Sequence, residues 1–151
     1  MSIFDNGNWE LVSPLVGGKR PARDSIHLTI SNKQIKLSRE AVKVMGSPTQ
    51  VDVWIATDSG RLLFINQGTD GRKTKDGAIH CYRTELISKV MEHLILYGSV
   101  KKYIEIERTY FCVEGKEFKE QDPKDQSKWL HGVEFDLANA YYCQRSWKKK
   151  E

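Results

Sequence analysis

The sequence predicts an α+β fold, a mostly antiparallel sheet with two helices arranged as two ββαββ-like cycles. Several short segments alternate apolar and polar side chains, which is typical of strands that bury one face. Two segments with helical spacing each end at a Gly-Ser pair, Gly46-Ser47 and Gly98-Ser99. The turn residues Asp58-Ser59-Gly60 separate two alternating runs and therefore predict a hairpin.

The first cycle is expected over residues 25–67. Two strands come first, with apolar side chains at alternate positions: Ile26, Leu28, Ile30, Ile35 and Leu37. Ser38 then predicts the N-cap of a short helix, which Gly46 ends in the left-handed conformation that favours glycine. Strands over residues 51–55 and 62–65 complete the cycle on either side of the hairpin turn.

A second cycle is expected over residues 78–137, after a glycine- and lysine-rich linker at residues 68–77. Residues 78–82 predict a strand, and Thr84 predicts the cap of a longer helix. The apolar side chains of this helix recur at helical spacing: Leu86, Ile87, Val90, Met91, Leu94 and Ile95.

Strands over residues 102–113 and 132–137 end the second cycle. The charged segment between them, residues 114–131, is long for a hairpin connection, so we expect either a functional excursion or a disordered insertion. The two cycles either pack face to face as one core with both helices outside, or resemble each other by chance. Residues 1–24 are expected to form a flexible arm and residues 138–151 a basic, aromatic tail.

Composition favours a cytoplasmic globular protein of one domain, or of two small ones that share a core. The chain has 151 residues, 39% of them hydrophobic, and no apolar run approaches the ~20 residues of a membrane-spanning helix. The N-terminus lacks the pattern of a secretory signal. Three widely spaced cysteines are an odd set, so we expect reduced thiols rather than a disulfide framework.

The residue spacings predict no enzyme, no cofactor and no metal site. No C-x-x-C or H-x3-H pair occurs, and His80 and Cys81, as neighbours on a strand, point to opposite faces. G-x-S-x-G, H-E-x-x-H and P-loop motifs are missing from the sequence. Glu105 and Glu107 share a strand face with basic neighbours, which is typical of a solvent-exposed face rather than of an acid/base pair.

Basic residues cluster at residues 19–23, 72–75 and 148–150, although the net charge is only +4. These clusters either contact an anionic partner or only keep the chain soluble. Near the C-terminus, aromatic and basic side chains either bind a partner or pack their rings onto the body of the protein. The candidate partner-binding residues there are Tyr141, Tyr142, Arg145 and Trp147.

Residues 27–67 resemble an AbrB/SpoVT-type swapped-hairpin domain. The matching pattern is the strand at residues 34–37, the short helix at 39–45 ending at Gly46, the strand at 51–55 and the returning strand at 62–65. More specifically, the chain is similar to small phage and bacterial proteins that carry such a unit near the N-terminus.

The resemblance implies a homodimer or a pseudo-dimer with interdigitated hairpins, and DNA binding through basic residues. Lys43 matches one of the family's paired helix arginines, whereas Val42 replaces the other, and Lys33-Gln34 stands where the family favours Gly-Arg. The candidate phosphate-binding residues are Lys33, Lys36, Arg39, Lys43, Arg72, Lys73 and Lys75.

Three functions are consistent with these observations. The first is a nucleic-acid-binding regulator. The second is a phage-encoded inhibitor, active in the host cytoplasm, that binds a host or defence protein or nucleoprotein in an anti-CRISPR-like manner. The third is a structural module that only forms oligomers.

Overall fold

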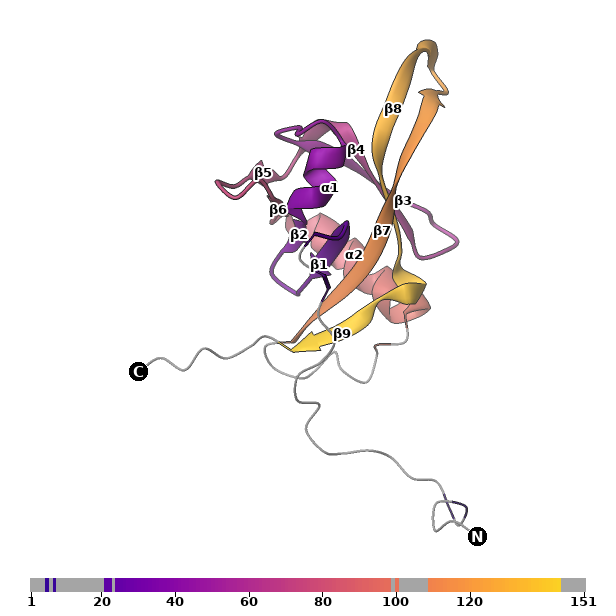
Figure 1. Cartoon of the computed structure of the whole chain (residues 1–151). Coiled ribbons are helices and arrows are strands. Elements are labelled where there is room, and N and C mark those ends of the chain that lie inside the picture. The colour runs from indigo at the N-terminus through magenta and orange to yellow at the C-terminus, as the bar shows by residue number, and fades with distance from the viewer. Residues whose placement is uncertain are drawn as a thin grey trace.

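The computed structural model describes residues 24–98 and 109–144, together with Asp5, Gly7, Pro21, Ala22 and Val100. Within these residues the chain is α+β, with nine strands in a mostly antiparallel, curled half-barrel and two helices (Figure 1). This confirms the predicted class. In chain order the elements are β1 (His27–Ile30), β2 (Ile35–Leu37), α1 (Arg39–Val44), β3 (Val51–Ile55), β4 (Arg61–Asp70), β5 (Arg72–Lys73), β6 (Ile79–Cys81), α2 (Thr84–Tyr97), β7 (Thr109–Asp122), β8 (Asp125–Asp136), the 3-10 turn η3 (Leu137–Asn139) and β9 (Tyr141–Gln144).

The strand order is β3-β4-β8-β7-β1-β2-β6-β5, with β9 also paired to β7. The long strand β7 joins the two parts of the sheet: its first half pairs with β1 and β9, and its second half pairs with β8. As a result, the β7–β8 hairpin lies between the β3–β4 hairpin and the β1–β2 hairpin.

Both predicted cycles contribute to a single hydrophobic core. Strands β1 and β2 bury the apolar side chains of their alternating pattern, and α1 and α2 pack their apolar faces into the same cluster. Phe64 of β4 and Phe135 of β8 are fully buried and meet edge to face, with ring centroids 5.6 Å apart. The burial of these rings ties the first cycle to the second.

The helix ends agree only in part with the predicted caps. Ser38 is the N-cap of α1, and its hydroxyl oxygen accepts from the backbone N–H of Ala41 at 3.3 Å. Gly46 follows the helix with φ +88°, as predicted. The predicted cap of α2 is wrong: Arg83 is its N-cap, without a side-chain cap bond. Gly98 ends α2 in an extended conformation, and glycine is required there because a Cβ would lie 2.6 Å from the Leu94 carbonyl oxygen.

Three segments differ from their predictions. Residues 68–77 are not an irregular linker, because residues 68–70 continue β4 and Arg72–Lys73 forms β5. Residues 114–131 are not a disordered insertion: they form most of the long β7–β8 hairpin, which projects beyond the rest of the sheet (Figure 1). Part of the expected tail, Tyr141–Gln144, is strand β9. Most of the predicted arm at residues 1–24 and of the strand portion at 102–108 lies outside the described residues.

Candidate nucleic-acid interface

Local hydrogen bonds form the turn of the β5–β6 hairpin, which the sequence pattern did not predict. The backbone N–H of Thr74 donates to the Ala78 carbonyl at 2.9 Å, and Asp76 accepts from the hydroxyl of Thr74 and from the Ala78 N–H. Gly77 completes the turn with φ +93°. These bonds hold the basic segment in one defined conformation at the edge of the sheet.

Across the sheet, strand register places basic side chains beside a histidine. Lys36 of β2 is paired with His80 of β6, and His80 is in turn paired with Arg72 of β5. Residues directly opposite in an antiparallel sheet share a face, so these three side chains project from the same surface. Their chain neighbours Ile35 and Ile79 are fully buried on the other face.

Further cations come from α1 and the rest of the hairpin. Arg39 and Lys43 lie one turn apart on the exposed side of α1, and Arg39 passes close to Gly77. Lys73 donates to the Ser47 carbonyl at 3.4 Å, just beyond the end of α1. We call the resulting group the basic cluster: Lys36, Arg39, Lys43, Arg72, Lys73 and Lys75.

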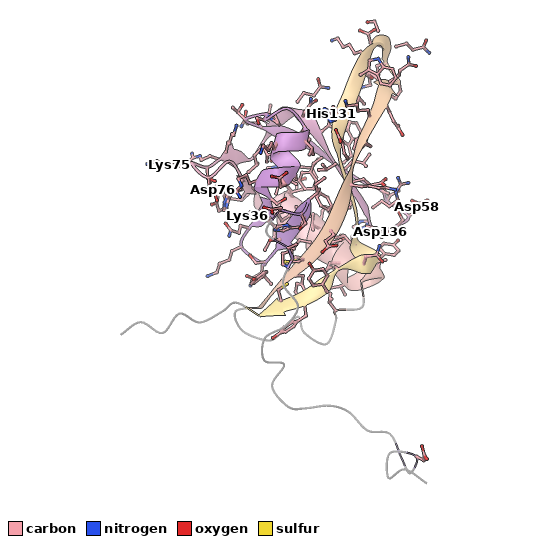
Figure 2. The ribbon with its side chains drawn as sticks, viewed as in Figure 1. Lys36, Asp58, Lys75, Asp76, His131 and Asp136 are labelled. Atoms are coloured by element: carbon pink, nitrogen blue, oxygen red, sulfur yellow. The ribbon has the colours of Figure 1, made fainter. Side chains whose placement is uncertain are left out.

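The acidic side chains of Glu40 and Asp76 lie beside cations of the basic cluster. Lys43 has an exposed pairing with Glu40 at 3.9 Å, a type of contact that contributes little. Asp76 lies near Lys36 and Lys75 (Figure 2), and its pKa is lowered, first by the hydrogen bond from Thr74 and then by the Ala78 N–H. Asp76 therefore stays ionised as part of the turn.

Lys33, the seventh predicted residue, lies apart from the cluster at the opposite end of β2. Its backbone N–H and that of Gln34 both donate to the hydroxyl oxygen of Ser31, which closes the β1–β2 turn. Its side chain is exposed. The other six predicted residues lie on α1, β2 and the neighbouring β5–β6 hairpin, with Lys36 and Arg72 on one face of the sheet and Lys73, paired with the buried Ile79, on the other.

Three further residues belong to this surface and were not predicted from the sequence: Gln34, His80 and Tyr82. His80 and Tyr82 form a stacked pair, with ring centroids 6.0 Å apart and planes at 17°. His80 Nδ1 donates to the Gln34 side-chain oxygen at 3.1 Å. Burial, together with the charge of Lys36, lowers the pKa of His80. The alternation of residues 79–82 could have shown that the two rings share a face.

Two of the aromatic residues predicted near the C-terminus, Tyr141 and Tyr142, lie on β9 and not on the elements of the basic cluster. Tyr142 is only 8% exposed and belongs to the hydrophobic core, so little of its ring can reach a partner. Tyr141 is half-buried on β9, which pairs with β7. Arg145 and Trp147 lie outside the described residues.

A hollow of about 600 Å³ lies beside the bulge of β4, with Asp52, Trp54 and Thr69 among its lining residues. Arg83 and Asp70 close one side with an ion pair of two hydrogen bonds, at 2.8 and 3.0 Å. No three His, Cys, Asp or Glu side chains in the described part of the chain come together as a metal site.

Comparisons with known proteins do not add to this description. No family model matches the chain, and neither the curated proteins nor the solved structures compared with it are similar. Neither α1 nor α2, the helices of the described residues, is long and apolar enough to cross a membrane.

Proposed function

We propose that this protein binds nucleic acid through the basic cluster, as a non-enzymatic regulator. The observation that carries the proposal is the gathering of six cations from α1, β2 and the β5–β6 hairpin around one edge of the sheet. A cluster of this kind is the usual electrostatic footprint of a phosphate-binding surface. The hydrogen-bonded hairpin holds several of these charges in place before any ligand arrives.

The arrangement of hairpins supports the resemblance to swapped-hairpin domains, which we keep as part of the proposal. Residues 27–70 have the order ββαββ. The hairpin of the second cycle inserts between the two hairpins of the first, which is the interdigitation that the resemblance implies. Because this occurs within one chain, it favours a pseudo-dimer over a homodimer.

The salt dependence of binding tests the proposal quantitatively. Each phosphate contact changes the slope of log K against log salt by about −0.9 for duplex DNA and about −0.7 for single strands. If about four to six cations of the cluster contact phosphates, affinity falls by roughly 10²–10³-fold between 50 and 200 mM salt. Fluorescence anisotropy with labelled oligonucleotides measures this directly.

A matched pair of charge variants shows whether the cluster is responsible. Arg72→Gln with Lys75→Gln removes two exposed charges from the hairpin, whereas Lys124→Gln with Lys128→Gln removes two from the β7–β8 hairpin. We expect the first variant to weaken binding and flatten the salt slope, and the second to do neither. No binding at 50 mM salt, or equal losses in both variants, contradicts the proposal.

The β7–β8 hairpin favours a second candidate function, binding of a host or defence protein. The hairpin projects from the body (Figure 1). Trp129 on this hairpin is 63% exposed, as expected of an anchor residue at a protein interface. The natural chain is used to capture proteins from a nuclease-treated lysate. A partner protein that binds the natural chain but not the Trp129→Ala variant supports this function. An empty eluate, or equal capture by both proteins, counts against it.

A further inference from the structure

The face that carries Lys36 and Arg72 also carries an exposed aromatic ring. Tyr82 is 59% exposed and directly follows β6, in the alternation that places His80 on this face. Its ring is nearly parallel to the imidazole of His80. A nucleic acid that contacts the cations of this face therefore meets a flat aromatic surface as well.

The stacked pair is held in position before binding. The hydrogen bond from His80 Nδ1 to Gln34 fixes the plane of the imidazole, and strand β2 holds Gln34 beside it. Burial and Lys36 both disfavour the charged form of His80, so the imidazole is neutral near pH 7. A fixed, neutral imidazole supports the Tyr82 ring from one side and leaves its other surface to solvent.

We infer that the ligand is a single-stranded nucleic acid, with an unpaired base stacked on Tyr82 and the neighbouring phosphates bound by Lys36 and Arg72. The inference rests on the proposed function. Bases in a duplex are already stacked on each other, whereas unpaired bases can be placed on an aromatic side chain.

The spacing of the side chains fits this arrangement. Lys36 and Arg72 lie on the strands that flank β6, so their backbones are about 10 Å apart, with His80 between them. Cations therefore flank His80, and Tyr82 stacks on that imidazole two residues further along the chain. Base stacking on an exposed ring is tolerant of sequence, so we expect similar affinity for different unstructured sequences.

The test compares an unstructured DNA 12-mer, the RNA of the same sequence and the corresponding DNA duplex, each titrated against the full chain at the same salt concentration. We expect at least one single strand to bind about tenfold or more tightly than the duplex. Tighter binding of the DNA strand or of the RNA strand identifies which of the two nucleic acids is the ligand, and either result supports the inference.

Variants of the exposed ring separate stacking from charge. Tyr82→Ala is expected to weaken single-strand binding about 5- to 150-fold without changing the salt slope, because no phosphate contact is lost. Tyr82→Phe keeps the ring and is expected to bind as the natural chain does. Trp129→Ala, which removes an exposed ring from the projecting hairpin, is the matched control and should leave binding unchanged.

Failure of this inference differs from failure of the proposed function. Two results overturn only the single-strand inference. The first is that the duplex binds as tightly as the single strands. The second is that Tyr82→Ala binds as the natural chain does, while the Arg72→Gln, Lys75→Gln variant binds weakly. If none of the three nucleic acids binds at 50 mM salt, both proposals are wrong. Thermal melting of each variant shows that the substitution at an exposed position has left the fold intact.

Discussion

The contact between Phe64 and Phe135 predicts that the two halves of the chain unfold together. Phe64 lies on β4, within the first cycle of the sequence, and Phe135 lies on β8, within the second. Both side chains are fully buried, and their rings meet edge to face at 87°. Replacing each by leucine, singly and together, measures how strongly this contact couples the two cycles.

The magnitude follows from the burial and geometry of the two rings. An edge-to-face pair contributes about 0.5–1.5 kcal/mol beyond the area that it buries. Leucine also fills less space than phenylalanine, so each single variant should lose about 1–2.5 kcal/mol in the free energy of unfolding. The double variant should lose less than the sum of the single losses, by about 0.5–1.5 kcal/mol, because the pair can be broken only once.

Urea denaturation followed by tryptophan fluorescence and by far-ultraviolet circular dichroism provides the measurement. We expect one transition, with the same midpoint by both probes and the same dependence on urea in all four proteins. If the loss of stability in the double variant equals the sum of the two single losses to within about 0.3 kcal/mol, the two rings do not couple the cycles. Two separate transitions, only one of which moves in Phe64→Leu, would refute the shared core itself.

Three further predictions concern single groups, two of them buried and one, His27, half-buried. Ser38→Ala should lower the free energy of unfolding by about 1–2 kcal/mol in chemical denaturation, because the Ser38 hydroxyl oxygen accepts from the backbone N–H groups of both Ala41 and His27. Ser38→Thr keeps a hydroxyl group and should retain most of the stability of the natural chain. Burial lowers the pKa of His27 below 6.5, so its contribution to the free energy of unfolding should be complete above pH 6.5 and should fall as the pH drops towards the lower folded-state pKa. The His27→Gln variant should therefore lose less stability than the natural chain between pH 7 and pH 5. The same pH profile in both proteins would contradict this prediction. Burial raises the pKa of Cys81 to about 12, so its thiol should resist iodoacetamide at pH 8 until the protein is unfolded, and mass spectrometry of modified peptides would detect any earlier reaction.

The proposed binding surface shows where local sequence patterns stop being informative. Lys36, Arg72 and His80 are neighbours across the sheet, yet 36 to 44 residues separate Lys36 from the other two along the chain. The basic residues were identifiable one by one from charge and from the family resemblance. Their assembly, and the addition of Tyr82, depended on the pairing of β2, β6 and β5.

Two segments escaped prediction for a related reason. The outer part of the β7–β8 hairpin projects into solvent, so most of its side chains are polar and they show no regular strand alternation, although Trp129 is also exposed there. Strand β5 is only two residues long and is held by its pairing with β6 and by the turn bonds of Asp76. A pattern of buried side chains cannot mark strands that bury so little.

The sequence by itself determined the local elements: the alternating strands, the Ser38 cap, the left-handed Gly46 and the apolar face of α2. These depend on neighbouring residues, whose hydrogen bonds and side-chain spacing act within one or two turns. Only the tertiary structure decided that the β7–β8 hairpin lies between the two hairpins of the first cycle, and that one basic edge results. Strand order depends on which apolar faces and backbone edges are buried together, and that free energy belongs to distant parts of the chain.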